Sequence, residues 1–461
     1  MPIVLPRVAA LSVAGALGLA ALGGLTSQGC KRREAPPTPI TSAAPSASVP
    51  PQEVTRCRRR PDFGLALETS RPVAKPEEPT EDEEDDALLP FGVDVGDAVP
   101  TPFGFAAAGI RGAGQAFVAV LGERSSRRVD LGELHGDAET PTVASYGESL
   151  LVAVRTTDAA GFTIKLGRVA GPESSAVEWG HELTKLGRSV TSVELAAQAG
   201  RGALVYQTEL KGELRLVLGS FPLAQLAAPF EAKPLDVKDA EMPRLLPRVG
   251  GFWLSWVRSL PEPKKAAGAT GLAPTDAGAP RDPEERELLD PGLRVVEVAK
   301  LDEQGRLSGA PLRVGEPRRQ VVLYDVAPLS SGGLLVATRS DSAAPGAEGG
   351  AILLAEVSVD GTVREERLDD DEIGAGAPTL LVDADASRPG PWLTVSAPND
   401  ATRLGLARGA STRLQADPLL GRAEVIAVSG GHFLAQRARG NSVVLETLDC
   451  SWPADAEPER K

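Results

Sequence analysis

The sequence has few of the side chains on which metal and redox sites depend. Its 461 residues include only three histidines, three cysteines and two methionines. His135, His181 and His432 are far apart, and neither a His-x-x-x-His nor a Cys-x-x-Cys spacing occurs, so the sequence predicts no metal site. The glycine-rich loops that cradle phosphates in Walker and dinucleotide motifs are also missing. We therefore expect no cofactor.

Positive charge is scarce as well. The chain has 49 Lys and Arg against 63 Asp and Glu, and its net charge is −14. No stretch forms the basic stripe that binds phosphate backbones, which argues against a nucleic-acid partner. Only one stretch, residues 8–29, is long and apolar enough to span a bilayer.

What the sequence has instead is a repeated hairpin. Its clearest copy is SGGLLVATR at 331–339, where two glycines precede an alternating apolar run. Glycine relaxes the backbone restriction of a tight turn, and alternation places successive side chains on opposite faces of a strand. Related copies begin at Gly112, Gly147, Gly200, Gly250, Gly390 and Gly430. Each copy has a bulky residue followed two positions later by a smaller one, with Tyr206 as the exception. The bulky residues, which we call the bulky column, are Phe117, Leu151, Leu204, Trp253, Leu335, Trp392 and Phe433.

The spacing of these copies predicts a β-propeller. Strand-like segments before and after each copy provide three or four strands per unit, and the period is about 53 residues, or about 48 without an insertion in the fourth unit. In their repeat period and in having three or four strands per unit, roughly residues 57–452 resemble WD-repeat and kelch-like propellers. No Trp-Asp ending and no kelch signature repeats, so the resemblance implies a fold and no functional residues. We expect an all-β, seven-bladed propeller, give or take one blade. A β-sandwich or a solenoid with similar hairpins is the alternative.

The N-terminus, residues 1–29, resembles the signal peptide of bacterial lipoproteins. Its apolar segment ends in Ser27-Gln28-Gly29-Cys30, and in that family the cysteine becomes the lipidated first residue. Leucine is usual where this chain has Ser27. The resemblance implies a lipid anchor on Cys30 in a Gram-negative cell envelope. Lys31, and not an aspartate, follows the cysteine, and in this the chain resembles lipoproteins that are sent to the outer membrane. A released protein and an uncleaved spanning helix are the alternatives.

Four segments have the composition of connectors. Residues 30–56, rich in Pro, Ala and Ser, predict a disordered tether. Residues 71–90 contain a contiguous acidic run that lacks the spaced carboxylates and turn glycine of a calcium loop, and so predict a solvated linker. Residues 260–289 lack periodicity and predict a disordered loop inside the fourth unit, and residues 453–461 predict a disordered tail.

Cys57 and Cys450 bracket the repeat region, and they form an even pair if Cys30 carries a lipid. The last unit supplies only three strands, whereas residues 62–68 form an orphan strand near the other end of the region. We therefore expect this strand to complete the last blade and a Cys57–Cys450 disulfide to hold the closure in an oxidising compartment. Two unpaired thiols in a cytosolic protein are the alternative.

Several other residues have two interpretations, and the structural one is the simpler in each case. The last two histidines fall near strand ends and would serve a pocket or pore only if the fold turned them inward. The acidic run at 369–372 could bind calcium, but a solvated turn also explains it. Trp253 and Trp392 belong to the bulky column, so packing explains them before a sugar-stacking role does, whereas Trp256 lies outside that column.

The main functional expectation is an exported, lipid-anchored propeller that acts as a non-catalytic binding or scaffolding module, with the membrane and a protein as its partners. Propellers also host hydrolases and lactonases, whose carboxylates or histidines come from several blades. A periplasmic hydrolase acting on a sugar or lactone would have such side chains clustered at a mouth of the axial channel, with at least one carboxylate of raised pKa. A subunit of an envelope assembly complex would expose an apolar patch on the rim.

Overall fold

The computed structural model describes residues 56–67 and 92–451, apart from segments 261–292, 343–350 and 369–375 and gaps of at most five residues. All of them belong to one compact unit, Glu53–Lys461. The expected signal peptide, the lipidated Cys30, nearly all of the tether, the acidic linker, almost the whole 260–289 loop, the acidic run at 369–372 and the tail lie outside the described residues. In the part that is described, no helix is long and apolar enough to cross a membrane.

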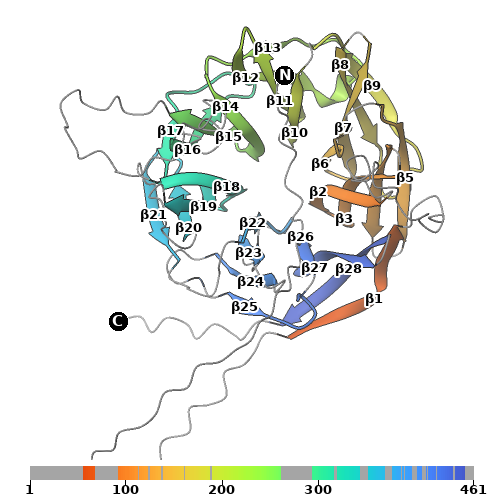
Figure 1. Ribbon diagram of the computed structural model, residues 1–461. Helices are drawn as coiled ribbons and strands as arrows, with labels where there is room; N and C mark the ends of the chain where they lie inside the picture. The colour runs from red at the N-terminus through yellow and green to blue at the C-terminus, as the bar shows by residue number, and fades with distance from the viewer. Residues whose placement is uncertain are drawn as a thin grey trace, which may run out of the picture. The chain divides into compact units, whose positions relative to one another are not determined.

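The described residues form seven four-stranded antiparallel sheets, arranged as the blades of a propeller around a common axis (Figure 1). This confirms the predicted fold class and blade number. Blade one contains β2 (Val93–Thr101), β3 (Gly104–Arg111), β4 (Gln115–Gly122) and β5 (Ser126–Glu133); blade two β6 (Thr142–Tyr146), β7 (Ser149–Asp158), β8 (Gly161–Val169) and β9 (Glu178–Leu183); blade three β10 (Val190–Gln198), β11 (Arg201–Leu210), β12 (Glu213–Pro222) and β13 (Ala232–Pro234). Blade four contains β14 (Ala240–Arg248), β15 (Gly251–Leu260), β16 (Leu293–Leu301) and β17 (Leu312–Val314); blade five β18 (Arg319–Pro328), β19 (Leu334–Ser342), β20 (Ala351–Val357) and β21 (Val363–Arg367). Blade six contains β22 (Pro378–Leu381), β23 (Trp392–Ser396), β24 (Thr402–Leu406) and β25 (Gln415–Ala416); blade seven β26 (Glu424–Ser429), β27 (His432–Arg439), β28 (Ser442–Ser451) and β1 (Arg56–Leu67).

The hydrophobic core lies between neighbouring blades, because each sheet packs its apolar side chains against the next sheet. The bulky residue of all seven repeated hairpins is buried, with at most 5% of its surface exposed. Trp253 packs between blades four and five, and Phe433 between blades six and seven. The indole N–H of Trp253 also donates a hydrogen bond to the carbonyl of Gly332, 3.3 Å away, in the turn of the next blade's copy. The repeat therefore stabilises contacts between blades as well as the hairpins themselves.

One copy of the repeat occupies a different place from the one predicted. In blades two to seven the turn glycines connect the first and second strands from the axis, whereas the copy at Gly112 connects β3 to β4, the second and third strands. The corresponding inner turn of blade one precedes Gly104, whose φ of 136° suits glycine. A Cβ at Gly104 would lie 2.2 Å from the carbonyl oxygen of Leu121. The predicted alignment is wrong for this copy, because alternation alone does not distinguish one hairpin of a blade from the next.

The ring closes through β1, which comes from the start of the propeller and pairs antiparallel with β28 from Arg56 opposite Ser451 to Leu67 opposite Val443. The closing strand was predicted at 62–68, and it is longer because it extends back past the cysteine. Cys57 and Cys450 form the expected disulfide, with 393 residues of sequence separation.

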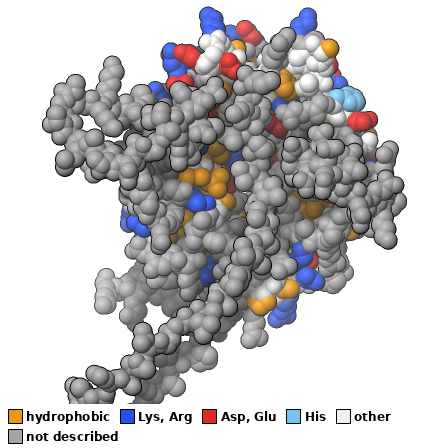
Figure 2. Space-filling view, viewed as in Figure 1, with side chains coloured by type: hydrophobic (Ala, Val, Ile, Leu, Met, Phe, Trp, Pro, Cys, Tyr) orange, Lys and Arg blue, Asp and Glu red, His pale blue; other side chains and the backbone are white. Residues whose placement is uncertain are grey.

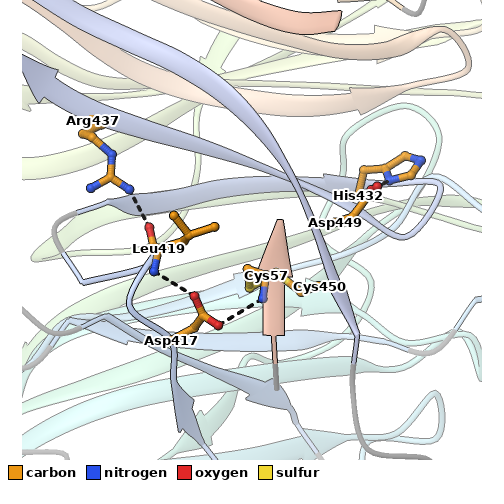
Figure 3. The surroundings of a disulfide bond; sticks show 7 residues. All are labelled: Cys57, Asp417, Leu419, His432, Arg437, Asp449 and Cys450. Atoms are coloured by element: carbon orange, nitrogen blue, oxygen red, sulfur yellow. Dashed lines mark hydrogen bonds and ion pairs between the residues drawn. A yellow bond between two sulfur atoms is a disulfide. The ribbon is translucent and has the colours of Figure 1, made fainter. Parts of the chain in front are cut away.

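Hydrogen bonds to Asp417 hold the closing strand beside blade six (Figure 3). The Cys57 N–H donates to Asp417 Oδ2 at 3.0 Å, and the Leu419 N–H donates to Oδ1 at 2.7 Å. Arg437, on β27, donates to the Leu419 carbonyl at 2.5 Å. The closure is therefore tied to both of the last two blades.

Candidate functional site

Charged and polar side chains from four blades come together where the inner strands surround the axis. The inner strands are β2, β6, β10, β14, β18, β22 and β26 (Figure 1). Arg244, on β14, interacts electrostatically with acidic and phenolic groups from three other inner strands. We call these five residues the axial cluster: Asp97 on β2, Glu194 on β10, Arg244 on β14, and Tyr324 and Asp325 on β18.

A β-bulge accompanies the axial cluster on each of these four strands. The bulges fall between Val95 and Ala98, between Thr191 and Glu194, between Glu241 and Arg244, and between Val321 and Leu323. Ser192 and Met242, within two of them, have φ values of 51° and 52°. A bulge bends its strand and re-aims the side chains beside it, and bulges are common next to active sites. These irregularities explain how charged side chains leave the blade interfaces and meet near the axis.

Arg244 links the two carboxylates of the neighbouring blades. Its Nη1 lies 2.5 Å from Glu194 Oε1, and its Nε lies 3.7 Å from Asp325 Oδ1. The exposed fractions of the Arg244, Glu194 and Asp325 side chains are 28%, 10% and 19%. The three side chains are thus largely withdrawn from water, yet solvent still reaches them, as a site that admits a ligand requires.

Tyr324 fixes the bulge that precedes Arg244. Its hydroxyl donates to the Met242 carbonyl at 2.5 Å and accepts a hydrogen bond from Ser255 Oγ at 3.4 Å. The Met242 N–H donates to Gln207 Oε1 at 3.1 Å. Side chains from two other blades therefore satisfy both backbone polar groups of Met242, and this rigidly positions the strand that carries Arg244.

The surroundings shift the pKa values of three members of the axial cluster. Burial raises the pKa of Asp325, although Arg244 and the Leu380 N–H, 2.8 Å from Oδ2, act in the opposite direction. Burial likewise raises the pKa of Tyr324. Burial opposes the charge on Arg244, but the carboxylates of Glu194 and Asp325 outweigh it and raise the pKa of the guanidinium. Asp325 thus keeps its proton to a higher pH than an ordinary aspartate, beside a second carboxylate that is ion-paired.

This arrangement can perform acid and base chemistry. A carboxyl group with a raised pKa can donate a proton, and a neighbouring ion-paired carboxylate can accept one or stabilise positive charge. Within the described residues no group of three or more His, Cys, Asp or Glu side chains is placed to hold a metal ion.

The three histidines do not join the axial cluster. His135 is exposed after β5, and the His181 ring on β9 packs edge-on against a phenylalanine ring at a centroid distance of 5.1 Å. His432 begins β27, where its Nδ1 is hydrogen-bonded to Asp449 (Figure 3). Its Nε2 lies 2.7 Å from Arg60 Nη1. His432 therefore belongs to the closing seam of the ring.

The tryptophans singled out in the sequence are core residues. Trp253 and Trp392 are 1% and 5% exposed, as their place in the bulky column predicts. Trp256, whose orientation the sequence left open, is fully buried between blades three and four. Packing therefore accounts for all three side chains.

The residues of the axial cluster were not predicted from the sequence. A signal existed, since each is a charged or phenolic residue within or beside an otherwise apolar inner strand, as in VELAA at 193–197 and LYDVA at 323–327. Only their convergence distinguishes them from ordinary strand residues.

The coloured part of the upper edge in Figure 2 is largely charged and polar. On the face in Figure 2, basic and acidic side chains lie side by side along the upper edge, and hydrophobic side chains are seen toward the centre. The coloured part of this edge does not show the apolar patch that an assembly subunit would expose.

Comparison with known proteins relates the chain to solved structures only. No family model and no curated protein sequence matches it. The polysaccharide lyase Uly1 matches with a TM-score of 0.50 and 9% identity over 86% of this chain and 99% of the lyase. An α-L-arabinanase from Penicillium chrysogenum has a TM-score of 0.41 and 11% identity, covering 67% and 92% of the two chains. The α-L-arabinofuranosidase Arb93A from Fusarium graminearum has a TM-score of 0.41 and 8% identity, covering 67% and 91%. The likeness to the lyase supports the propeller fold.

The expectation of a non-catalytic binding or scaffolding module is wrong. It relied on the lack of any convergent set of charged side chains, and the structure brings such a set together around the axis. The solved structure that shares the fold over 86% of this chain is also that of a polysaccharide lyase. The physical reason for the error is that sequence distance conceals which inner-strand residues face one another across a ring.

Proposed function

We propose that this propeller is an enzyme that hydrolyses glycosidic bonds in a carbohydrate, with the axial cluster as its active site. The observation that carries the proposal is the meeting of Arg244 with two unlike carboxyl groups, one of raised pKa and one tightly ion-paired. Glycoside hydrolysis commonly uses a carboxylic acid and a carboxylate in separate roles. The names of the structural neighbours, which refer to polysaccharide and arabinoside substrates, support a sugar as the substrate.

In the proposed reaction Asp325 is the general acid. It donates its proton to the glycosidic oxygen as the bond from that oxygen to the anomeric carbon breaks. Glu194, ion-paired with Arg244, accepts a proton from the water whose oxygen bonds to the anomeric carbon. Transfer of one proton through solvent from Glu194 to Asp325 restores the starting state, and the net reaction consumes one water per bond cleaved.

Release of reducing ends from arabinan and xylan tests this proposal. Asp325→Asn and Glu194→Gln should each lower kcat/KM by about 100-fold to 10,000-fold, the range typical of lost acid or base catalysis. Asp236→Asn and Glu231→Gln are matched controls, because both side chains are exposed on blade three, outside the axial cluster. Wild-type rates in both active-site variants, or no release of reducing ends by the unaltered protein, would contradict the proposal.

We also propose that the enzyme works in the cell envelope, anchored by a lipid on Cys30. The lipoprotein-like N-terminus supports this location, and the Cys57–Cys450 disulfide fits an oxidising compartment. In this arrangement residues 30–55 tether the propeller, residues 71–90 are a linker, residues 261–289 are a loop and residues 453–461 are a tail, while Arg56 and Leu260 belong to β1 and β15. Labelled palmitate should enter the wild-type protein and not a Cys30→Ser variant, and the labelled protein should fractionate with the outer membrane.

A further inference from the structure

Blade two exposes an aromatic side chain on its outer edge. Trp179 lies on β9, the strand of that blade farthest from the axis, and it is 42% exposed. The other described tryptophans, Trp253, Trp256 and Trp392, are at most 5% exposed. An indole offers a large, rigid apolar surface to a ligand, so the exposed part of Trp179 is a candidate contact for one.

A glycine on the neighbouring strand provides a seat for this indole. Gly167 of β8 is paired with Trp179 across the sheet. A Cβ at position 167 would lie 2.9 Å from Cε3 and 3.1 Å from Cζ3 of Trp179, and 2.6 Å from Cγ2 of Val177. The six-membered ring of the indole therefore occupies the space that a side chain at 167 would need, and it is held against the sheet while part of it faces solvent.

A charged pair lies on the same two strands as the seated indole, one register shift away. Lys165 precedes Gly167 by two positions on β8, so their side-chain directions share one face of the sheet. Lys165 Nζ lies 3.4 Å from Glu182 Oε1, and the two side chains are 40% and 46% exposed. A second ion pair on the same two strands, Arg168 with Glu178 at 2.6 Å, belongs to the opposite face of the sheet, because each residue directly adjoins a member of the Gly167–Trp179 pair. The Lys165–Glu182 pair thus provides a donor and an acceptor that still reach water on the face that carries the indole.

We propose that Trp179, with Lys165 and Glu182, forms a surface site that binds a sugar residue of a polysaccharide. The C–H face of a sugar ring would pack on the indole, and its hydroxyl groups would exchange hydrogen bonds with the ammonium and carboxylate groups. A protein partner fits less well, because a stable protein interface buries about 800 Å² of surface per partner around an apolar centre. One indole beside an ion pair offers a far smaller apolar area. The inference rests on the proposed carbohydrate substrate, and the site would hold a polysaccharide on the rim while the axial cluster cleaves it.

Affinity electrophoresis of the mature protein in gels containing arabinan or xylan tests the site. We expect at least one of the two to retard the wild-type protein, Trp179→Ala to bind about three- to tenfold more weakly, and Trp179→Phe to bind with intermediate strength. Tyr146→Ala is the matched control, since Tyr146 is an exposed aromatic residue of the same blade, at the end of its inner strand. An unchanged thermal unfolding midpoint would show that Trp179→Ala is folded.

The outcomes for the surface site and the active site are separable. Asp325→Asn should lose hydrolysis and keep its retardation, whereas Trp179→Ala should be retarded less than wild type and still cleave short oligosaccharides. Retardation of Trp179→Ala equal to that of wild type, loss of retardation in Asp325→Asn, or no retardation of wild type by either polysaccharide would overturn the surface site. Retardation that depends on Trp179 in a protein that cleaves nothing would retain the surface site and refute the proposed hydrolase.

Discussion

Replacing both Cys57 and Cys450 by serine would remove the one covalent link that closes the ring. The disulfide joins positions 393 residues apart, and for a loop of that length chain entropy alone suggests about 6 kcal/mol of stabilisation. Loss of native disulfides more often costs about 2–5 kcal/mol, because the reduced unfolded chain retains some structure. The pairing of β1 with β28 and the ion pair between Arg59 and Glu446, at 3.0 Å, remain in the variant. We therefore expect a loss of about 3–5 kcal/mol in the free energy of unfolding.

Urea unfolding, followed by tryptophan fluorescence and by circular dichroism, measures this loss. The midpoint should fall in the double variant and in the reduced wild type to the same extent, and reductant should not lower it further in the variant. Hydrogen exchange should show faster opening of β1 and β28 than of the blades opposite the seam. If the variant and the oxidised wild type unfold within about 0.5 kcal/mol of each other, strand pairing alone closes the ring and the argument from loop entropy fails.

Four further predictions concern the axial cluster and the turns. Because burial raises the pKa of Asp325, its acid form is lost only as pH rises through that raised value; wild-type activity should fall along this alkaline limb, and the residual activity of Asp325→Asn should lack it in a pH–rate profile. Because the raised pKa makes ionised Asp325 less favourable in the folded than in the unfolded chain, the wild type loses stability as pH rises from the ordinary aspartate pKa through the raised value. The unfolding free energy of Asp325→Asn relative to wild type should therefore increase over this interval in urea titrations, and a constant difference would show that the carboxyl group is not perturbed. Tyr324→Phe removes the hydrogen bond to the bulge carbonyl and should cost about 1–3 kcal/mol in thermal unfolding, with a lower kcat and an unaltered pH profile; an altered profile would mean that the phenol itself titrates in the reaction. Gly251→Ala, at φ 142° with a Cβ 2.1 Å from a backbone oxygen, should destabilise by about 2 kcal/mol or more, and more than Gly212→Ala, where only the positive φ opposes the new side chain; equal losses would contradict the steric argument.

Much of the fold follows from local chemistry. Turn glycines and alternating apolar runs specify hairpins through interactions within a few residues, and their sevenfold recurrence predicts the blade number. The bulky column predicts burial for the same reason, and all seven of its members are buried. The closing disulfide was also predictable, since two cysteines flank the repeat region in a chain whose N-terminus resembles a lipoprotein signal peptide. The sequence did not show which hairpin of blade one contains the copy at Gly112, because the hairpins of this blade share one pattern and only strand pairing distinguishes them.

The functional features depend on the tertiary structure. Asp97 and Asp325 lie 228 positions apart in the chain (325 − 97), and they face the same guanidinium only because seven blades return the chain around one axis. The bulges that turn these side chains toward the axis have no local sequence pattern, and burial, which raises the pKa of Asp325, results from the whole ring. Trp179 is likewise defined by its glycine partner on another strand. Hairpins are short-range objects that sequence alone determines, whereas the axial cluster and the indole seat are contacts between distant strands, which only the closed ring brings together.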